Sequence, residues 1–233
     1  MAVPTNLDLY QGLLYQLDRY GAPTFEVPEF NYWWNFGTRK FISKTLEVFD
    51  LTQKVTDALR ALVRNGYVLI NETDETSFKK CDLPENYNRL LNCFVTIRFK
   101  EDRECYSEGD TLKVKASRLT ADLAAYILDN TYHKPRYDRP YYHVIGNELH
   151  LFIDTENTVD EGVVIESVDF QYIGQPNRVK LRTDFDTSQE ADEDKCEFDE
   201  TVTDEITKVT LKLILERQGD AQRLQTNTSL DVN

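Results

Sequence analysis

Apolar residues recur every three to four positions near the start of the chain, which is the period of an amphipathic helix. We expect Asn6 to cap a first helix that ends at Gly21 and carries the apolar residues Leu9, Leu13, Leu17 and Tyr20. A second helix is predicted from Pro28 to Val48, because proline suits a first helical turn. Asp50 and Gln53 form a capping box for a third helix, which ends at Asn65-Gly66.

The same periodicity returns only at the other end of the chain, from Asp199 to Gln218. One face of this last helix carries Val202, Ile206, Val209 and Leu213. A helix with a single apolar stripe must pack on other helices. We therefore predict a helical bundle made of residues 1–65 plus 199–218. Residues 219–233 are polar and do not continue the pattern, so we expect a flexible tail that takes up order on a partner.

The pattern between these ends changes to the alternation typical of strands. Strands are predicted at 67–70, 90–99, 111–116, 141–145, 148–153, 163–173 and 178–182. Gly146-Asn147 is a hairpin signal, and residues 117–129 read as one short helix. The predicted fold class is therefore α+β. The helical bundle would carry an inserted, antiparallel, sandwich-like β-rich domain at residues 66–198.

Charge is distributed unevenly along the chain. The formal net charge is −14, and the window from Asp184 to Glu205 alone holds eleven Asp or Glu against one Lys. A solvated loop is the simpler interpretation, since the window lacks the glycine and closing glutamate of a calcium loop. Such acidity disfavours direct duplex binding, because phosphate affinity comes from Lys and Arg. The four cysteines include no close pair, so we expect reduced thiols.

Catalytic motifs are missing from the sequence. There is no glycine-rich phosphate loop, nucleophile elbow or zinc-protease motif among the 233 residues. His143 and His150 face each other across the predicted hairpin, but the sequence supplies no third ligand nearby. We therefore predict a protein without enzymatic activity, metal or cofactor. A divalent metal bound at these two histidines would revive an enzymatic interpretation.

Two aromatic segments are candidates for contacts with partners. The adjacent Trp33 and Trp34 could form a platform for a base or sugar. The better interpretation places one ring in the core and the other at an interface. The segment Tyr132–Tyr142 could touch nucleic acid or an acidic partner, or fold onto itself. Tyrosine and arginine also concentrate in protein–protein hot spots, which makes Arg136, Tyr137, Arg139 and Tyr141 interface candidates.

Four segments in this order resemble one protein family. They are FEVPEFNYWWNFGTRKFISKTLEVFDLTQKVTDALRAL, LPENYNRLLNC, VVIESVDFQYIGQPNRVKL and CEFDETVTDEITKVTLKLILERQGDAQRLQ. The chain resembles the head-to-tail connector proteins, also called adaptor or ring proteins, of short-tailed bacteriophages. It is most similar to those of crAss-like phages that infect Bacteroidetes. The resemblance spans nearly the whole chain and departs from the family in the length and acidity of residues 184–199.

The resemblance implies a virion structural protein that is made in the host cytoplasm and acts in the neck or tail. Such proteins form a closed homo-oligomeric ring of twelve copies beneath the portal protein, with the β-rich domain toward the tail. The portal-facing residues implied for this chain are Arg217, Arg223, Leu224 and Gln225. Asp192, Glu193 and Asp194 would line the passage for genomic DNA, where negative charge repels phosphates and prevents specific binding. Trp33, Trp34 and the Arg136–Tyr141 residues are then candidates for tail-side or subunit contacts. A stopper or tail-tube protein, and less favourably a soluble binding module, are the alternatives.

Overall fold

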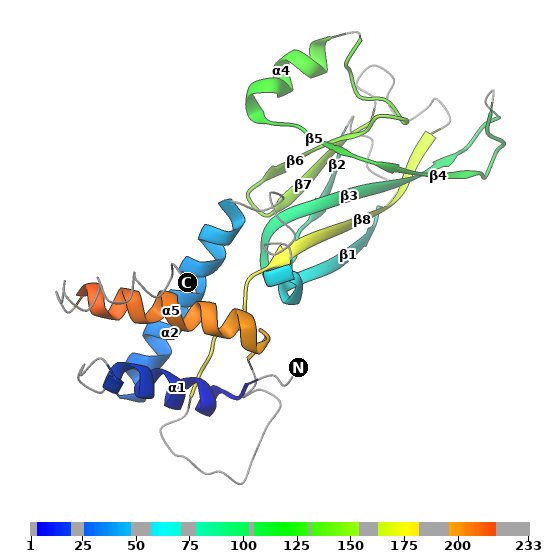
Figure 1. Cartoon of the computed structure of the whole chain (residues 1–233). Helices are drawn as coiled ribbons and strands as arrows, with labels where there is room; N and C mark the ends of the chain where they lie inside the picture. The colour runs from blue at the N-terminus through cyan, green and yellow to red at the C-terminus, as the bar shows by residue number, and fades with distance from the viewer. Residues whose placement is uncertain are drawn as a thin grey trace. The chain divides into compact units, whose positions relative to one another are not determined.

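The computed structural model describes residues 4–19, 26–47, 57–70, 78–102, 105–130, 132–153, 163–181 and 196–217. Within them the fold is α+β, with helices and antiparallel-rich sheets (Figure 1). The helices are α1 (Asn6–Arg19), α2 (Val27–Glu47), the 3₁₀ turn η1 (Arg60–Leu62), α4 (Ala121–Asp129) and α5 (Glu200–Arg217). The strands are β1 (Val63–Leu69), β2 (Phe78–Asp82), β3 (Tyr87–Phe99), β4 (Thr111–Lys115), β5 (Ser117–Arg118), β6 (Tyr141–Ile145), β7 (Glu148–Phe152) and β8 (Val163–Gly174).

The chain divides into two compact units. One unit combines Met1–Leu62 with Pro176–Asn233, and the other is Val63–Gln175. The helices from both chain ends therefore share a unit, and the described strands make up the other. The borders differ from those expected from the sequence at two places. Residues 63–65 belong to a strand instead of a helix, and residues 176–198 group with the helical unit instead of the β-rich one.

The cap of the first helix lies one residue earlier than expected. Thr5, not Asn6, is the capping residue, because its hydroxyl accepts the backbone N–H of Asp8 at 3.2 Å. Asp8 accepts from the Thr5 hydroxyl at 2.7 Å and from its backbone N–H at 3.0 Å, which completes a capping box. These hydrogen bonds lower the pKa of the Asp8 carboxyl. On the inner face Leu9, Leu13 and Leu17 are buried, as their spacing predicts.

Helix α5 packs against α2 and also contacts α1 (Figure 1). Val202 and Ile206 are buried, as expected, but Val209 and Leu213 are only half-buried. The inner face continues instead through Thr210 and Ile214. Thr210 fits there because its hydroxyl donates to the carbonyl of Ile206 at 2.9 Å, which satisfies the buried polar group. Gly37 of α2 lies directly opposite, where an added Cβ would be 3.0 Å from the Cβ of Thr210.

The predicted third helix is wrong at its C-terminal end. Residues 57–58 are helical and η1 follows, but Val63 already pairs with Ile173 as the first residue of β1. Seven successive residues of β1 pair antiparallel with β8, and this tertiary ladder outweighs the helical spacing of Leu59, Leu62 and Val63. The proposed capping box at Asp50 and Gln53 lies outside the described residues.

The predicted strand at 178–182 is not a strand over its described residues, 178–181, whose backbone pairs with side chains instead of a sheet. Asn35 of α2 donates to the carbonyl of Val179 at 2.8 Å and accepts its N–H at 2.9 Å. Asn31, one turn earlier, does the same for Leu181, at 3.0 and 2.8 Å. Each side-chain amide thus replaces the peptide group of a neighbouring strand. These four hydrogen bonds explain why this segment belongs to the helical unit.

Replacing Asn35 by alanine should lower the free energy of unfolding by about 1–3 kcal/mol, since a part-buried N–H and C=O of Val179 lose their partners. Asn31→Ala should act similarly on Leu181. Chemical denaturation followed by circular dichroism measures both effects. The matched control is the exposed Asn88→Ala, which should stay within about 0.5 kcal/mol of the unchanged protein. Equal stability of all three variants would show that the amides do not hold this segment.

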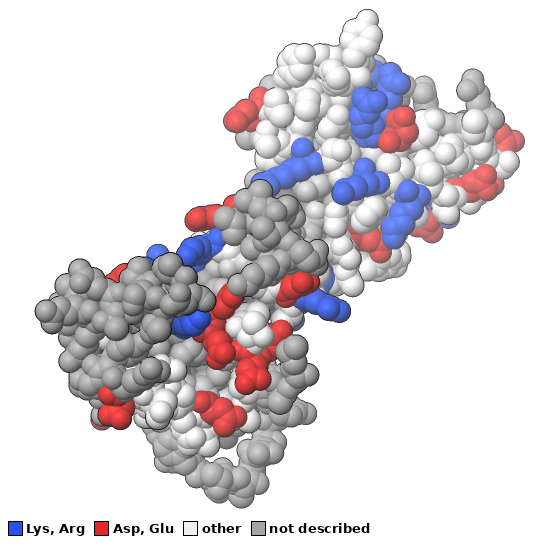
Figure 2. All heavy atoms as spheres, in the orientation of Figure 1, with Lys and Arg blue, Asp and Glu red and all other residues white. Residues whose placement is uncertain are grey.

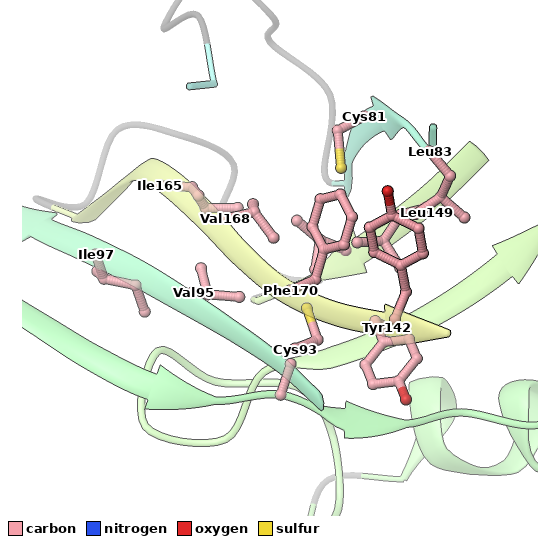
Figure 3. Close-up of a cluster of buried hydrophobic side chains, with 13 residues drawn as sticks. Cys81, Leu83, Cys93, Val95, Ile97, Tyr142, Leu149, Ile165, Val168 and Phe170 are labelled. Atoms are coloured by element: carbon pink, nitrogen blue, oxygen red, sulfur yellow. The ribbon is translucent and has the colours of Figure 1, made fainter. Parts of the chain in front are cut away.

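The β-rich unit is a sandwich of two four-stranded sheets. Their strand orders are β1-β8-β3-β4 and β2-β7-β6-β5, and only the short β5–β6 pair is parallel. Alternate residues of β3 point into the core, among them Cys93, Val95 and Ile97 (Figure 3). They meet Leu149 and Leu151 of the opposite sheet. The β6–β7 hairpin turns at Gly146, whose φ of 61° favours glycine.

The short helix expected at residues 117–129 is α4, which starts later, at Ala121. Ser117 and Arg118, the first two residues expected in this helix, form β5 instead and pair with Tyr141 and Tyr142. In the described part of the chain, no helix has the length and apolar character needed to cross a membrane.

Candidate interaction surface

Three aromatic side chains gather on the outer side of α2. Tyr32 and Trp33 pack edge to face with ring centroids 5.2 Å apart, and Phe36 stacks on Tyr32 at 6.2 Å. Trp33 also meets Phe36 edge to face at 6.2 Å. Tyr32 is 55% exposed, while Trp33 and Phe36 are half-buried. A helix places Phe36 beside both of the other rings, because it lies four positions after Tyr32 and three after Trp33.

Two cations complete this group. The guanidinium of Arg217 lies 5.3 Å from the ring centroid of Trp33, and the ammonium of Lys40 lies 5.8 Å from that of Phe36. Arg217 ends α5, where a cation also suits the negative end of the helix dipole. We refer to Tyr32, Trp33, Phe36, Lys40 and Arg217 as the Trp33 surface. It joins helices from both ends of the chain, and Arg217 is the last described residue before the C-terminal segment.

The Trp33 surface has the composition of a protein-binding hot spot. Tryptophan, tyrosine and arginine dominate such sites because they bury a large area with few rotatable bonds. The rings pack on one another, so little side-chain entropy is lost on binding. The structure thereby brings Arg217 and Trp33 together, although the sequence analysis assigned them to different partner faces.

The neighbouring Trp34 does not belong to this surface. It is 1% exposed and stacks on Phe30 at 5.9 Å in the core of the helical unit. The sequence predicts one ring in the core and one at an interface, and the structure places Trp34 in the core and leaves Trp33 half-buried at the surface. The inclusion of Trp34 among the interface candidates is therefore wrong, because a core side chain cannot reach a partner.

The basic-aromatic segment Tyr132–Tyr142 forms a second exposed feature, on the β-rich unit. Arg136 and Arg139 are exposed and close a turn, with the N–H of Arg139 donating to the carbonyl of Arg136 at 3.0 Å. Tyr137 between them is half-buried and packs edge to face on Phe99 at 5.6 Å. Tyr141 is half-buried at the start of β6. Tyr137 thus holds the turn on the sandwich while both arginines remain accessible.

Apolar side chains are also exposed close to this segment in the sequence. Leu123 and Tyr126 of α4 are 49% and 62% exposed, and Tyr132 is 86% exposed. Figure 2 shows Lys and Arg side chains on the drawn face of the β-rich unit, interspersed with Asp and Glu. Mixed charge with exposed aromatic residues is typical of protein contacts, whereas a backbone-tracking groove for nucleic acid would need continuous positive charge.

The two histidines noted in the sequence do face each other. His143 and His150 are direct partners in the β6–β7 ladder. The Nε2 atom of His150 lies 3.0 Å from a carboxylate oxygen of Glu148, and this hydrogen bond, together with Lys80, lowers the pKa of Glu148. Among the described residues, no group of three or more potential ligands is arranged to hold a metal ion.

The three buried cysteines are unsuited to nucleophilic chemistry at neutral pH. Burial raises the pKa of Cys81 to about 11 and that of Cys93 to about 12. Burial also raises the pKa of Cys196, whereas Cys105 is exposed. All four thiols are free, and Cys81 and Cys93 lie within the sandwich core, near Phe170 (Figure 3). We conclude that these two thiols contribute packing instead of reactivity.

The remaining candidates from the sequence lie outside the described residues. They are Arg223, Leu224 and Gln225 of the C-terminal segment and Asp192, Glu193 and Asp194 of the acidic window. Comparison with models of known protein families gives no match, and a search of curated protein sequences gives none either. The functional argument therefore depends on the residues and surfaces described above.

Proposed function

We propose that this chain is a non-enzymatic virion structural protein, one subunit of a ring that connects the portal of a short-tailed bacteriophage to its tail. The observation that carries the proposal is the Trp33 surface. It includes Arg217, one of the C-terminal residues that the family resemblance expects to face the portal. Its exposed aromatic rings and Arg217 have the chemistry of a protein contact.

Subunit contacts and tail contacts would use other surfaces in this proposal. On the β-rich unit, the exposed arginines Arg136 and Arg139 and the apolar side chains of α4 are available to a neighbouring ring or tail protein. The chain would act by assembly alone, as a homo-oligomer of twelve copies through which genomic DNA passes. A stopper or tail-tube protein uses similar surfaces, and the partner distinguishes it from a portal connector.

Mass photometry of the purified chain, alone and mixed with the portal ring of the same virus, tests the proposal. We expect stoichiometric addition to the portal, lost when Leu224–Asn233 is deleted. Arg217→Glu should weaken the addition at least about tenfold, because a central hot-spot arginine is worth about 1.4 kcal/mol or more. Lys115→Glu, an exposed charge reversal on β4, is the matched control and should bind as the unchanged protein does.

If the protein binds a tail component and has no affinity for the portal, it would be assigned to a ring of the tail instead of the portal connector. Binding to neither, with the chain remaining a monomer, would contradict a ring subunit altogether. A portal complex that forms equally well with Arg217→Glu would leave the connector role intact and remove the Trp33 surface from it.

A further inference from the structure

The four sheet edges of the β-rich unit are not equally protected against pairing with another chain. Lysine side chains or very short length normally discourage such pairing. Edge strand β2 carries Lys79 and Lys80, β4 carries Lys113 and Lys115, and β5 is only two residues long. β1 is the exception, because it spans seven residues, contains no lysine, and has Arg64 as its one charged residue.

β1 also presents apolar side chains to solvent. Tyr67 and Leu69, two positions apart on one face, are 59% and 64% exposed. On the other face Val68 is only partly buried against the sandwich core. Within the described residues, β8 is the only strand that pairs with β1. A long edge without lysine and with exposed aromatic and aliphatic side chains is the kind that accepts an additional strand.

The C-terminal segment has the sequence of such a strand. From Leu224 to Val232 the residues alternate strictly, with Leu, Thr, Thr, Leu and Val at the even positions and Gln, Asn, Ser and Asp between them. Threonine and valine favour extended backbone, and the segment contains no Gly, Pro or Lys. Nine residues extend roughly 30 Å at about 3.3 Å each, enough to follow the roughly 23 Å of β1.

We propose that residues 224–232 of one copy add as a strand to the free edge of β1 in a neighbouring copy. The even-numbered side chains would lie beside Tyr67 and Leu69, since aromatic and β-branched or aliphatic neighbours stabilise adjacent strands. The donor and the acceptor are different surfaces, so the contact is head-to-tail, and such contacts generate a ring when the rotation between successive copies closes. The choice of a neighbouring copy rests on the ring proposed above.

Cysteine cross-linking between two differently tagged copies tests this pairing without any portal present. Both copies carry Cys105→Ser, which removes the exposed native thiol, while the other three thiols are buried. One copy also carries Leu69→Cys and the other Leu230→Cys. After mixing and mild oxidation we expect a disulfide-linked heterodimer. It should form at least about tenfold more than with Lys115→Cys, on the lysine-bearing edge β4, in place of Leu69→Cys.

A second pair of variants separates strand pairing from chance collision. Thr228→Pro in the donor copy should reduce the heterodimer at least about tenfold, because proline cannot donate to a ladder. Thr228→Val keeps both the backbone donor and the strand preference, and it should cross-link as the parent does. Yield no higher than with the β4 control, or insensitivity to Thr228→Pro, would each overturn the proposal.

The cross-link reports on the contact between copies and portal addition reports on the connector role, although both involve the segment that begins at Leu224. A chain that binds the portal but gives no heterodimer retains its proposed function and loses this contact. A chain that gives the heterodimer but ignores every portal and tail component retains the contact and loses the connector role.

Discussion

Replacing Trp34 by alanine should lower the free energy of unfolding of the helical unit by about 3–5 kcal/mol, the range for a fully buried large aromatic side chain. Trp34 is 1% exposed, stacks on Phe30, and is among the largest buried side chains of the described residues. Its removal leaves a cavity between α2 and its neighbours that packed helices cannot fully close. Denaturant titration followed by far-ultraviolet circular dichroism measures the loss.

Trp33 provides the matched comparison, because it has the same chemistry one position earlier. It is half-buried, and its main partners are Tyr32, Phe36 and Arg217 at the surface. Trp33→Ala should therefore cost only about 1 kcal/mol in stability while it weakens portal addition as Arg217→Glu does. Equal destabilisation by the two substitutions would contradict the division between core and surface. A stable Trp33→Ala variant with full portal binding would exclude the Trp33 surface as the contact.

The sequence predicts the helices at the chain ends because their signals are local. The apolar period of α1 and the acids and caps around α5 lie within a few residues of one another, so the predicted bounds are close to those observed. The buried face of α5 is harder to predict. Thr210 counts as polar in the sequence, and only its hydrogen bond to the carbonyl of Ile206 makes it suitable for the interior.

Long-range pairing explains the other errors. Val63 continues the apolar spacing of a helix, but it pairs with β8, far along the chain, and therefore lies in a strand. The segment at 178–181 alternates as a strand should, yet its backbone partners are the amides of Asn31 and Asn35. The sequence of a single segment does not show which groups its backbone will pair with. The amides of Asn31 and Asn35 can be recognised as partners only when the position of α2 is known.

The candidate surface was predictable only in its parts. Trp33 and Arg217 were both named from the sequence, each for its residue type and position. That they form one surface follows from the contact of α2 with α5, which brings Gly37 against Thr210 and Trp33 against Arg217. The absence of lysine from β1 has meaning only after the sheet order shows that β1 is an edge.

Gly37 decides how closely α2 and α5 approach, so Gly37→Ala should destabilise the helical unit by about 1–2 kcal/mol. A Cβ built at Gly37 collides with the hydroxyl of Thr210 and would be 3.0 Å from its Cβ and 3.2 Å from its Cα. The Cα belongs to the backbone of α5, so relief requires the two helices to separate. Overpacking of this kind typically costs about 1–3 kcal/mol, more than the gain of up to about 1 kcal/mol when alanine replaces glycine in a helix.

Gly12 of α1 is the matched control, because it is an exposed helical glycine with nothing within 4 Å of an added Cβ. Gly12→Ala should stabilise the protein by about 0.5–1 kcal/mol, so the same substitution at two glycines should act in opposite directions. Thr210→Ala removes the nearest clashing atom, and combined with Gly37→Ala it should recover part of the loss in a double-mutant cycle. Stabilisation by Gly37→Ala would mean that α2 and α5 do not pack at this distance. The Trp33 surface, which depends on the same crossing to hold Arg217 over its ring, would then lose its structural basis.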